Sequence, residues 1–136
     1  MKSRYVFALV LVLVVSYPAS VLAFTWTHVL MSDLEGGRHG PLDAYRHTLA
    51  SAFVAYTFAP SAVQFVSYVM ENNAKRSSAM DRHNNSIGAK FGENAARLTD
   101  LQPLVAVAIK NGAINAQHPQ QSTWLPKEDW RPGKLW

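Results

Sequence analysis

The fold is decided by residues 41–56, which read PLDAYRHTLASAFVAY. Apolar side chains recur there at three- and four-residue intervals, at Leu42, Tyr45, Leu49, Ala52, Phe53 and Tyr56. This spacing predicts an amphipathic α-helix. Pro41 suits the first position of a helix, where its missing N–H costs nothing, and Pro60 is expected to end the helix.

Three further helices are expected around this one. Residues 61–73 form the first of them, with a buried face made of Val63, Val66, Val69 and Met70. A helix over 78–98 starts at a capping box of Ser78 and Asp81, and a helix over 101–109 follows a second capping box of Thr99 and Gln102. Residues 113–136 hold three prolines and three tryptophans and predict an ordered, irregular tail. The sequence therefore predicts an all-α fold, a small bundle of about four helices.

The N-terminal segment has the three-part plan of a secretory signal peptide. Lys2 and Arg4 precede the apolar run 6–15, Pro18 follows it, and Val21 and Ala23 supply small residues before a cleavage point. We expect residues 1–23 to be removed, which leaves one domain over 24–136 that is exported to a periplasmic or extracellular location. The alternative is an uncleaved N-terminal anchor, which would bring membrane contact.

Composition narrows the classes of protein further. The chain has 136 residues, of which 49% are hydrophobic and 16% charged, so a folded core is expected. It contains no cysteine, which excludes disulfides, thiol nucleophiles and Cys-ligated zinc. The formal charge of +4 falls to +2 when Lys2 and Arg4 are removed. This balance argues against a nucleic-acid partner.

Two short stretches carry the side chains most suited to chemistry. In the first, Asp43 and His47 lie four residues apart on one helical face, with Arg46 beside them. A carboxylate next to an imidazole fixes its tautomer, as a general base requires. The same pair equally fits a structural interaction near the positive N-terminus of a helix.

In the second stretch, residues 80–92, four side chains share one helical face: Asp81, Asn85, Gly88 and Gly92. The two glycines allow another backbone to approach closely. The first helix offers a matching face of small and polar residues, which are Ala44, His47, Ser51 and Ala55. Packing the two faces together would gather the polar groups of both stretches into one cluster.

These stretches resemble a family of largely uncharacterised bacterial exported domains, some of them associated with toxins. Its members share a "DA-x-RH" helix and a later "MD-x-x-NN-x-x-G" helix, which here are residues 43–47 and 80–88. The resemblance covers about residues 38–92. It implies functional roles for Asp43, Arg46, His47, Asp81, Asn84 and Asn85, and a less regular binding role for His39.

Two hypotheses of function follow. In the first, the protein is a hydrolase acting on phospholipid or peptidoglycan, similar in outline to secreted phospholipases of the A2 type. His47 activates water, Asp43 or Asp81 orients it, and Arg46 or Asn85 stabilises negative charge. We expect no cofactor and no bound metal, although Asp43, His47, Asp81 and His83 form an alternative mixed ligand set. In the second, the cluster is a buried packing network in an envelope-binding or structural module.

Overall fold

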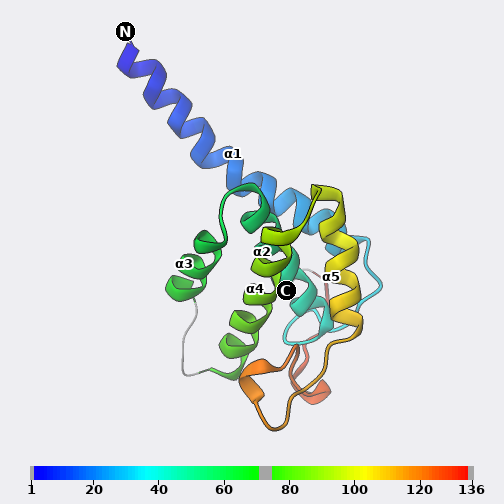
Figure 1. The fold of residues 1–136 in the computed structure, drawn as a ribbon. Coiled ribbons are helices and arrows are strands. Elements are labelled where there is room, and N and C mark those ends of the chain that lie inside the picture. The colour runs from blue at the N-terminus through cyan, green and yellow to red at the C-terminus, as the bar shows by residue number, and fades with distance from the viewer. Residues whose placement is uncertain (1, 71–74, 135–136) are drawn as a thin grey trace.

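The computed structural model describes residues 2–70 and 75–134 and is all-α, as predicted. Within those residues it contains no strand, and the connections include three short 3-10 turns. Figure 1 shows a bundle from which one long helix projects. The helices are α1 (Lys2–Leu30), α2 (Pro41–Thr57), α3 (Pro60–Met70), α4 (Arg76–Asn94) and α5 (Leu101–Lys110).

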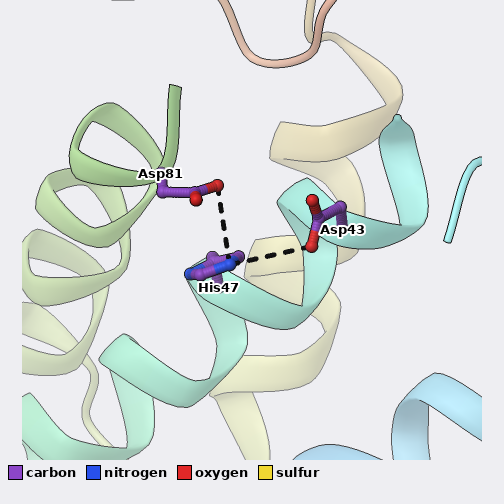
Figure 2. A group of neighbouring side chains, drawn as sticks. All are labelled: Asp43, His47 and Asp81. Carbon is purple, nitrogen blue, oxygen red and sulfur yellow. Dashed lines mark ion pairs between the residues drawn. The ribbon is translucent and has the colours of Figure 1, made fainter. Parts of the chain in front are cut away.

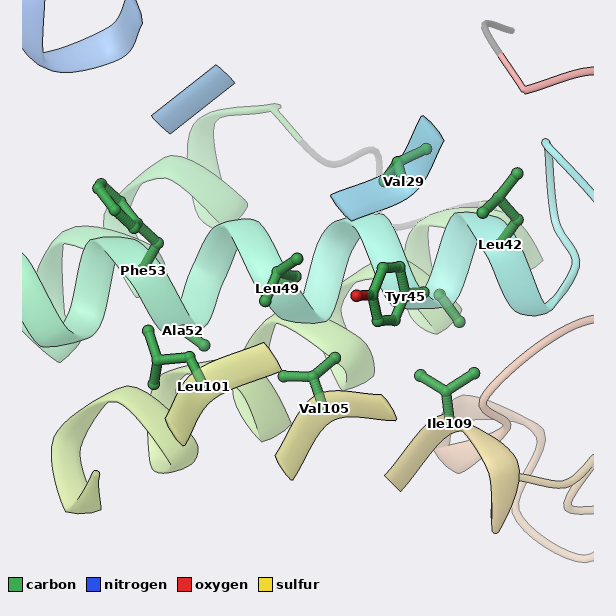
Figure 3. Packing of buried hydrophobic residues seen from close by; sticks show 10 residues of the cluster. Val29, Leu42, Tyr45, Leu49, Ala52, Phe53, Leu101, Val105 and Ile109 are labelled. Carbon is green, nitrogen blue, oxygen red and sulfur yellow. The ribbon is translucent and has the colours of Figure 1, made fainter. Parts of the chain in front are cut away.

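Helix α2 is the centre of the bundle, and the other four helices pack around it. Its apolar face meets α5 on one side and the C-terminal part of α1 on the other (Figure 3). The residues of this core are fully or almost fully buried, among them Val29, Leu42, Tyr45, Leu49, Leu101 and Val105. The apolar residues predicted to share one face of residues 41–56 therefore lie in the core. The one exception is Tyr56, at the end of the helix, which is exposed.

Helices α2 and α4 approach each other closely through the two glycines of α4. A Cβ atom on Gly88 would lie 2.2 Å from the carbonyl oxygen of Thr48, and one on Gly92 would lie 2.3 Å from that of Ala52. Both distances are shorter than van der Waals contact, so only glycine allows this separation of the helices. The predicted pairing of the glycine face with the small face of α2 is confirmed, and it brings the polar ends of both faces together.

Helix α1 has two unlike halves. Residues 3–16 are exposed along their whole length and project away from the bundle (Figure 1). From Tyr17 onward, one side of the helix packs on the domain through Val21, Phe24, Thr25, His28 and Val29. The cleavage point predicted after Ala23 lies inside α1, which continues unbroken through that residue.

Both predicted capping boxes are wrong. Helix α4 begins at Arg76, so Ser78 lies inside its first turn and no side chain caps the helix. The start of α5 also lacks a side-chain cap, because Gln102 donates instead to the hydroxyl of Tyr45 at 3.2 Å. In both places a side chain expected to cap its own helix contacts another helix instead. Asp81 of α4 faces His47 on α2, and Gln102 of α5 bonds to Tyr45 on α2.

Two helix predictions need further correction. Helix α4 ends at Asn94, four residues before the expected end, because Ala95 is extended. On α3, Val63 is buried against Ala55 and Ala89 as expected, but Val66 is 54% exposed. The predicted end of this helix at residue 73 and the side chains of Val69 and Met70 lie outside the part that the structure describes.

The tail is irregular, as predicted, and it holds the loop that precedes α2. The backbone N–H of Leu125 donates to the carbonyl of His39 at 2.8 Å, and Arg38 and Arg131 form a two-residue antiparallel bridge. The indole of Trp130 lies against Gly36 and Gly40. Trp124 packs against the core, while Trp136 lies outside the described residues.

Candidate functional site

His47 lies between two carboxylates that come from different helices (Figure 2). Its Nε2 atom is 3.7 Å from Oδ1 of Asp43 on α2 and 3.5 Å from Oδ1 of Asp81 on α4. The Asp43 side chain is 5% exposed and that of Asp81 17%, whereas His47 is 28% exposed. The imidazole is thus held by two nearly buried acids while part of it stays accessible, which is an arrangement suited to proton transfer.

Asp43 connects this cluster to the start of α2. Its Oδ2 accepts the backbone N–H of His39 at 2.7 Å, and its Oδ1 accepts a hydrogen bond from the Arg46 guanidinium. His39 has a φ of 64°, in the left-handed region that costs a non-glycine residue roughly 1–3 kcal/mol. The carboxylate therefore fixes a strained loop and faces His47 at the same time.

Arg46 reaches Asp43 through Nη2 and lies over the ring of Trp26, 5.6 Å from its centre. Its side chain is largely buried, and its Nη1 has no hydrogen-bond partner among the residues that the structure describes. One nitrogen of the guanidinium thus bonds to Asp43, and the other, Nη1, is buried away from solvent.

Asn85 lies in the middle of a relay that joins three helices. Its Oδ1 accepts from the Ser51 hydroxyl on α2 at 2.9 Å, and its Nδ2 donates to the Ser67 hydroxyl on α3 at 2.8 Å. The side chain is buried, although it borders the cavity described below. We interpret Asn85 as a residue that holds the helices around the site, since its amide is already bonded at both ends.

Asn84 and His39 occupy different surroundings. Asn84 is buried and donates to the backbone carbonyl of Thr123 at 2.8 Å, so it secures the tail and does not line the cavity. His39 does line it, with Nδ1 3.9 Å from Oδ2 of Asp43. The resemblance implied binding roles for both Asn84 and His39, and the structure brings only His39 into the cluster.

The alternative metal ligand set is only partly brought together. Ligand atoms of Asp43, His47 and Asp81 lie within 4.8 Å of one another, a separation that a single cation could bridge, and His83 is not among them. Burial, with a smaller effect of Lys90, lowers the pKa of His83. Oδ1 of Asp43, which faces His47, already accepts from Arg46, so a cation would compete with the guanidinium.

The cluster forms one end of a cavity of about 600 Å³ between α2, α3 and α4. The polar end is lined by Asp43, His47 and Asp81 together with Arg38, His39, Arg46 and Lys75. Farther along α2 and α3 the lining includes apolar side chains, namely Val21, Ala50, Val54, Val63 and Val66, together with the bonded polar groups of Ser51, Ser67 and Asn85. A molecule that carries both a charged and an apolar part matches this lining.

Sequence reasoning missed several residues of this cavity. Ser67 sits in an ordinary amphipathic pattern, and Arg38 and Lys75 read as surface charges in loops. Val21 lies in the segment expected to be removed. Only the tertiary arrangement brings these four residues to the cluster, and no local signal in the sequence marks them.

Comparison with known proteins places the chain in a family. The family model described as Domain of unknown function (DUF6973) matches residues 4–117. The chain belongs to this family. No curated protein and no solved structure gives a significant match. The match contains both helices that carry the cluster and starts at Arg4, just before the apolar run of α1, whereas most of the tail lies beyond it.

Proposed function

We propose that the protein is an exported hydrolase of an envelope substrate, with His47 as its general base. The observation that carries the proposal is the position of His47 Nε2 between the carboxylates of Asp43 and Asp81, at the polar end of a cavity. A nitrogen facing two carboxylates carries the proton, which leaves the lone pair on Nδ1 to accept a proton from water. A cavity-lining histidine of this kind supports hydrolysis.

The reaction needs no covalent intermediate on the protein. His47 takes a proton from water, and the water oxygen forms a bond to the carbonyl carbon of a phospholipid ester or of a peptidoglycan amide. The bond to the leaving oxygen or nitrogen breaks, and that atom takes the proton back from the imidazolium. Asp43 and Asp81 stabilise the imidazolium, and the positive charge of Arg46, whose side chain lines the cavity, favours the negative charge that develops on the substrate.

The competing hypothesis of a packing network explains only part of the cluster. Asn84 and Asn85 hold the tail and the helices, as such a network would require. It gives no reason for a partly exposed histidine between two acids at a cavity, since buried structural networks are expected to be closed and fully bonded.

The test is His47→Gln in the full chain, assayed against phospholipid vesicles and against peptidoglycan. We expect hydrolysis of one substrate to fall by about 10²–10⁴-fold, while the unfolding temperature stays near that of the wild type. His118→Gln, in the exposed tail, is the matched control and should keep full activity. A chelator should leave the rate unchanged, because Arg46 occupies Oδ1 of Asp43.

Three results would contradict the proposal. A wild-type protein that hydrolyses neither substrate would remove its basis. Full activity in His47→Gln would exclude the general-base role. Loss of activity with chelator would assign activation of water to a cation held by Asp43, His47 and Asp81 and not to the imidazole.

A further inference from the structure

We propose that the cavity takes an anionic phospholipid from the membrane in which α1 is anchored, with the headgroup at His47 and the chains at the apolar end. Hydrolysis of the bound lipid rests on the function proposed above, whereas binding of the lipid does not. Three independent features carry the inference: the lining of the cavity, the exposed half of α1, and the direction in which α1 lies on α2.

The polar end of the cavity carries uncompensated positive charge. Arg38 and Lys75 are exposed and take part in no ion pair within the described ranges 2–70 and 75–134. The acids Asp43 and Asp81 face His47, and Asp43 also pairs with Arg46. With His47 neutral, three cations (Arg38, Arg46 and Lys75) stand against two carboxylates, so the lining keeps one net positive charge, which favours a phosphate-bearing headgroup.

The exposed half of α1 has the composition of a membrane anchor. Residues 3–30 form a helix long and apolar enough to cross a bilayer, with a mean hydropathy of 2.5 in its most apolar window, none of which is buried in the bundle. The same helix then packs on the domain, with the ring of Phe24 4.7 Å from that of Phe53 and with Val29 fully buried. Cleavage after Ala23 would divide this helix and remove Val21 from the wall of the cavity.

The direction of α1 sets the apolar end of the cavity toward the membrane. α1 runs antiparallel to α2, because Tyr17 bonds to Thr57 at 2.8 Å while Trp26 lies beside Arg46. The exposed half therefore leaves the bundle at the C-terminal end of α2. Val54 lies near that end, and His47 lies about 10 Å farther from it along the helix axis.

The length of the anchor holds that end of the domain close to the bilayer. Residues 3–17 span about 22 Å as a helix, less than the roughly 30 Å of a bilayer's hydrocarbon core. The apolar side chains where α1 leaves the bundle must therefore enter the interface, and among them Phe58 is 74% exposed. A lipid lifted from this bilayer keeps its chains toward the membrane and brings its headgroup to His47.

The test measures lipid binding to the full-length His47→Gln protein by native mass spectrometry in detergent, so that turnover does not consume the ligand. Phosphatidylglycerol should bind about tenfold more tightly than phosphatidylcholine. Lys75→Glu should weaken the binding of phosphatidylglycerol, and the control Lys110→Glu on α5 should not. Both residues are exposed, so both variants are expected to fold.

The apolar end is tested with a second matched pair. Val66 and Val107 are 54% and 58% exposed, but only Val66 lines the cavity. Val66→Asp should weaken the binding of both lipids, and Val107→Asp should leave it unchanged. Inorganic phosphate should not displace the lipid. If phosphate displaces it and Val66→Asp has no effect, the site binds only a phosphate anion and the inference is overturned.

The binding and the function can fail separately. If the lipid binds as described and the wild type leaves it intact, the inference stands and the proposed hydrolysis fails. If the wild type hydrolyses peptidoglycan and neither charged nor zwitterionic lipid binds, the inference fails and the hydrolase proposal stands.

Discussion

At the scale of single residues, the cluster divides into side chains that face the cavity with unused capacity and side chains whose hydrogen bonds hold the fold. His47 belongs to the first kind and Asn85 to the second. Asp43 belongs to both, since one of its oxygens fixes the loop at His39 and the other faces His47. A substitution of Asp43 would therefore mix a loss of stability with a loss of chemistry.

Asn85→Ala is expected to destabilise the protein by about 1–3 kcal/mol, because it leaves the hydroxyls of buried Ser51 and half-buried Ser67 without their partner. Chemical denaturation of the full chain measures this. Asn94→Ala on the same helix removes only an exposed bond to the carbonyl of Lys90 and should cost under about 0.5 kcal/mol. Equal stability of the two variants would show that the hydrogen bonds of Asn85 to Ser51 and Ser67 do not stabilise the fold.

At the scale of secondary-structure elements, the site depends on how closely α4 approaches α2. Gly88 and Gly92 set that distance, and the distance in turn lets Asp81 reach His47. The glycines thus act on the site without contributing a functional group to it.

Gly88→Ala is expected to cost about 1–3 kcal/mol of stability, because the added methyl meets the rigid backbone of Thr48. This loss comes despite the better helix propensity of alanine, which alone is worth about 1 kcal/mol. Ser86→Ala, on the exposed side of the same helix, keeps the propensity effect and lacks the clash, so it should be neutral or stabilising. Thermal unfolding measures the stability of both variants, and a stabilised Gly88→Ala would contradict the close contact of α4 with α2.

The success of sequence reasoning also varies with the element. The core face of α2 and the glycine face of α4 follow from residue spacing alone, so the meeting of Asp43, His47 and Asp81 could be predicted. The helix starts at Ser78 and Thr99 could not, because tertiary contacts and an earlier helix start took the place of the local caps. The roles of Val21, Ser67 and Lys75 depend on contacts between segments distant in sequence, which no local pattern records.

At the scale of the whole molecule, cleavage or retention of the N-terminal part of α1 decides whether the domain is released or stays attached to the membrane. The sequence predicts that residues 1–23 are removed, whereas the bond of Tyr17 to Thr57 and the packing of Val21 on the core favour their retention. Cleavage and retention predict different masses for the purified protein, and this mass is simple to measure.

We expect the intact chain to be recovered from the membrane fraction of expressing bacterial cells, at the mass of all residues from the N-terminus onward. Intact-mass spectrometry of the purified protein measures this. As a control, a flexible insert after Ser16 lengthens the connection between the exposed half of α1 and the domain. The chain with this insert should also be recovered uncleaved, at its own full mass. Recovery of a soluble form that lacks residues 1–23 would overturn the anchor.

The contact between the tail and the loop before α2 has a consequence for the order of biosynthesis. The apolar start of α1 is translated before the rest of the bundle. Residues 122–131, which hold the loop at Arg38 and His39, are translated after all five helices. The site is therefore among the last parts of the described fold to be completed during synthesis.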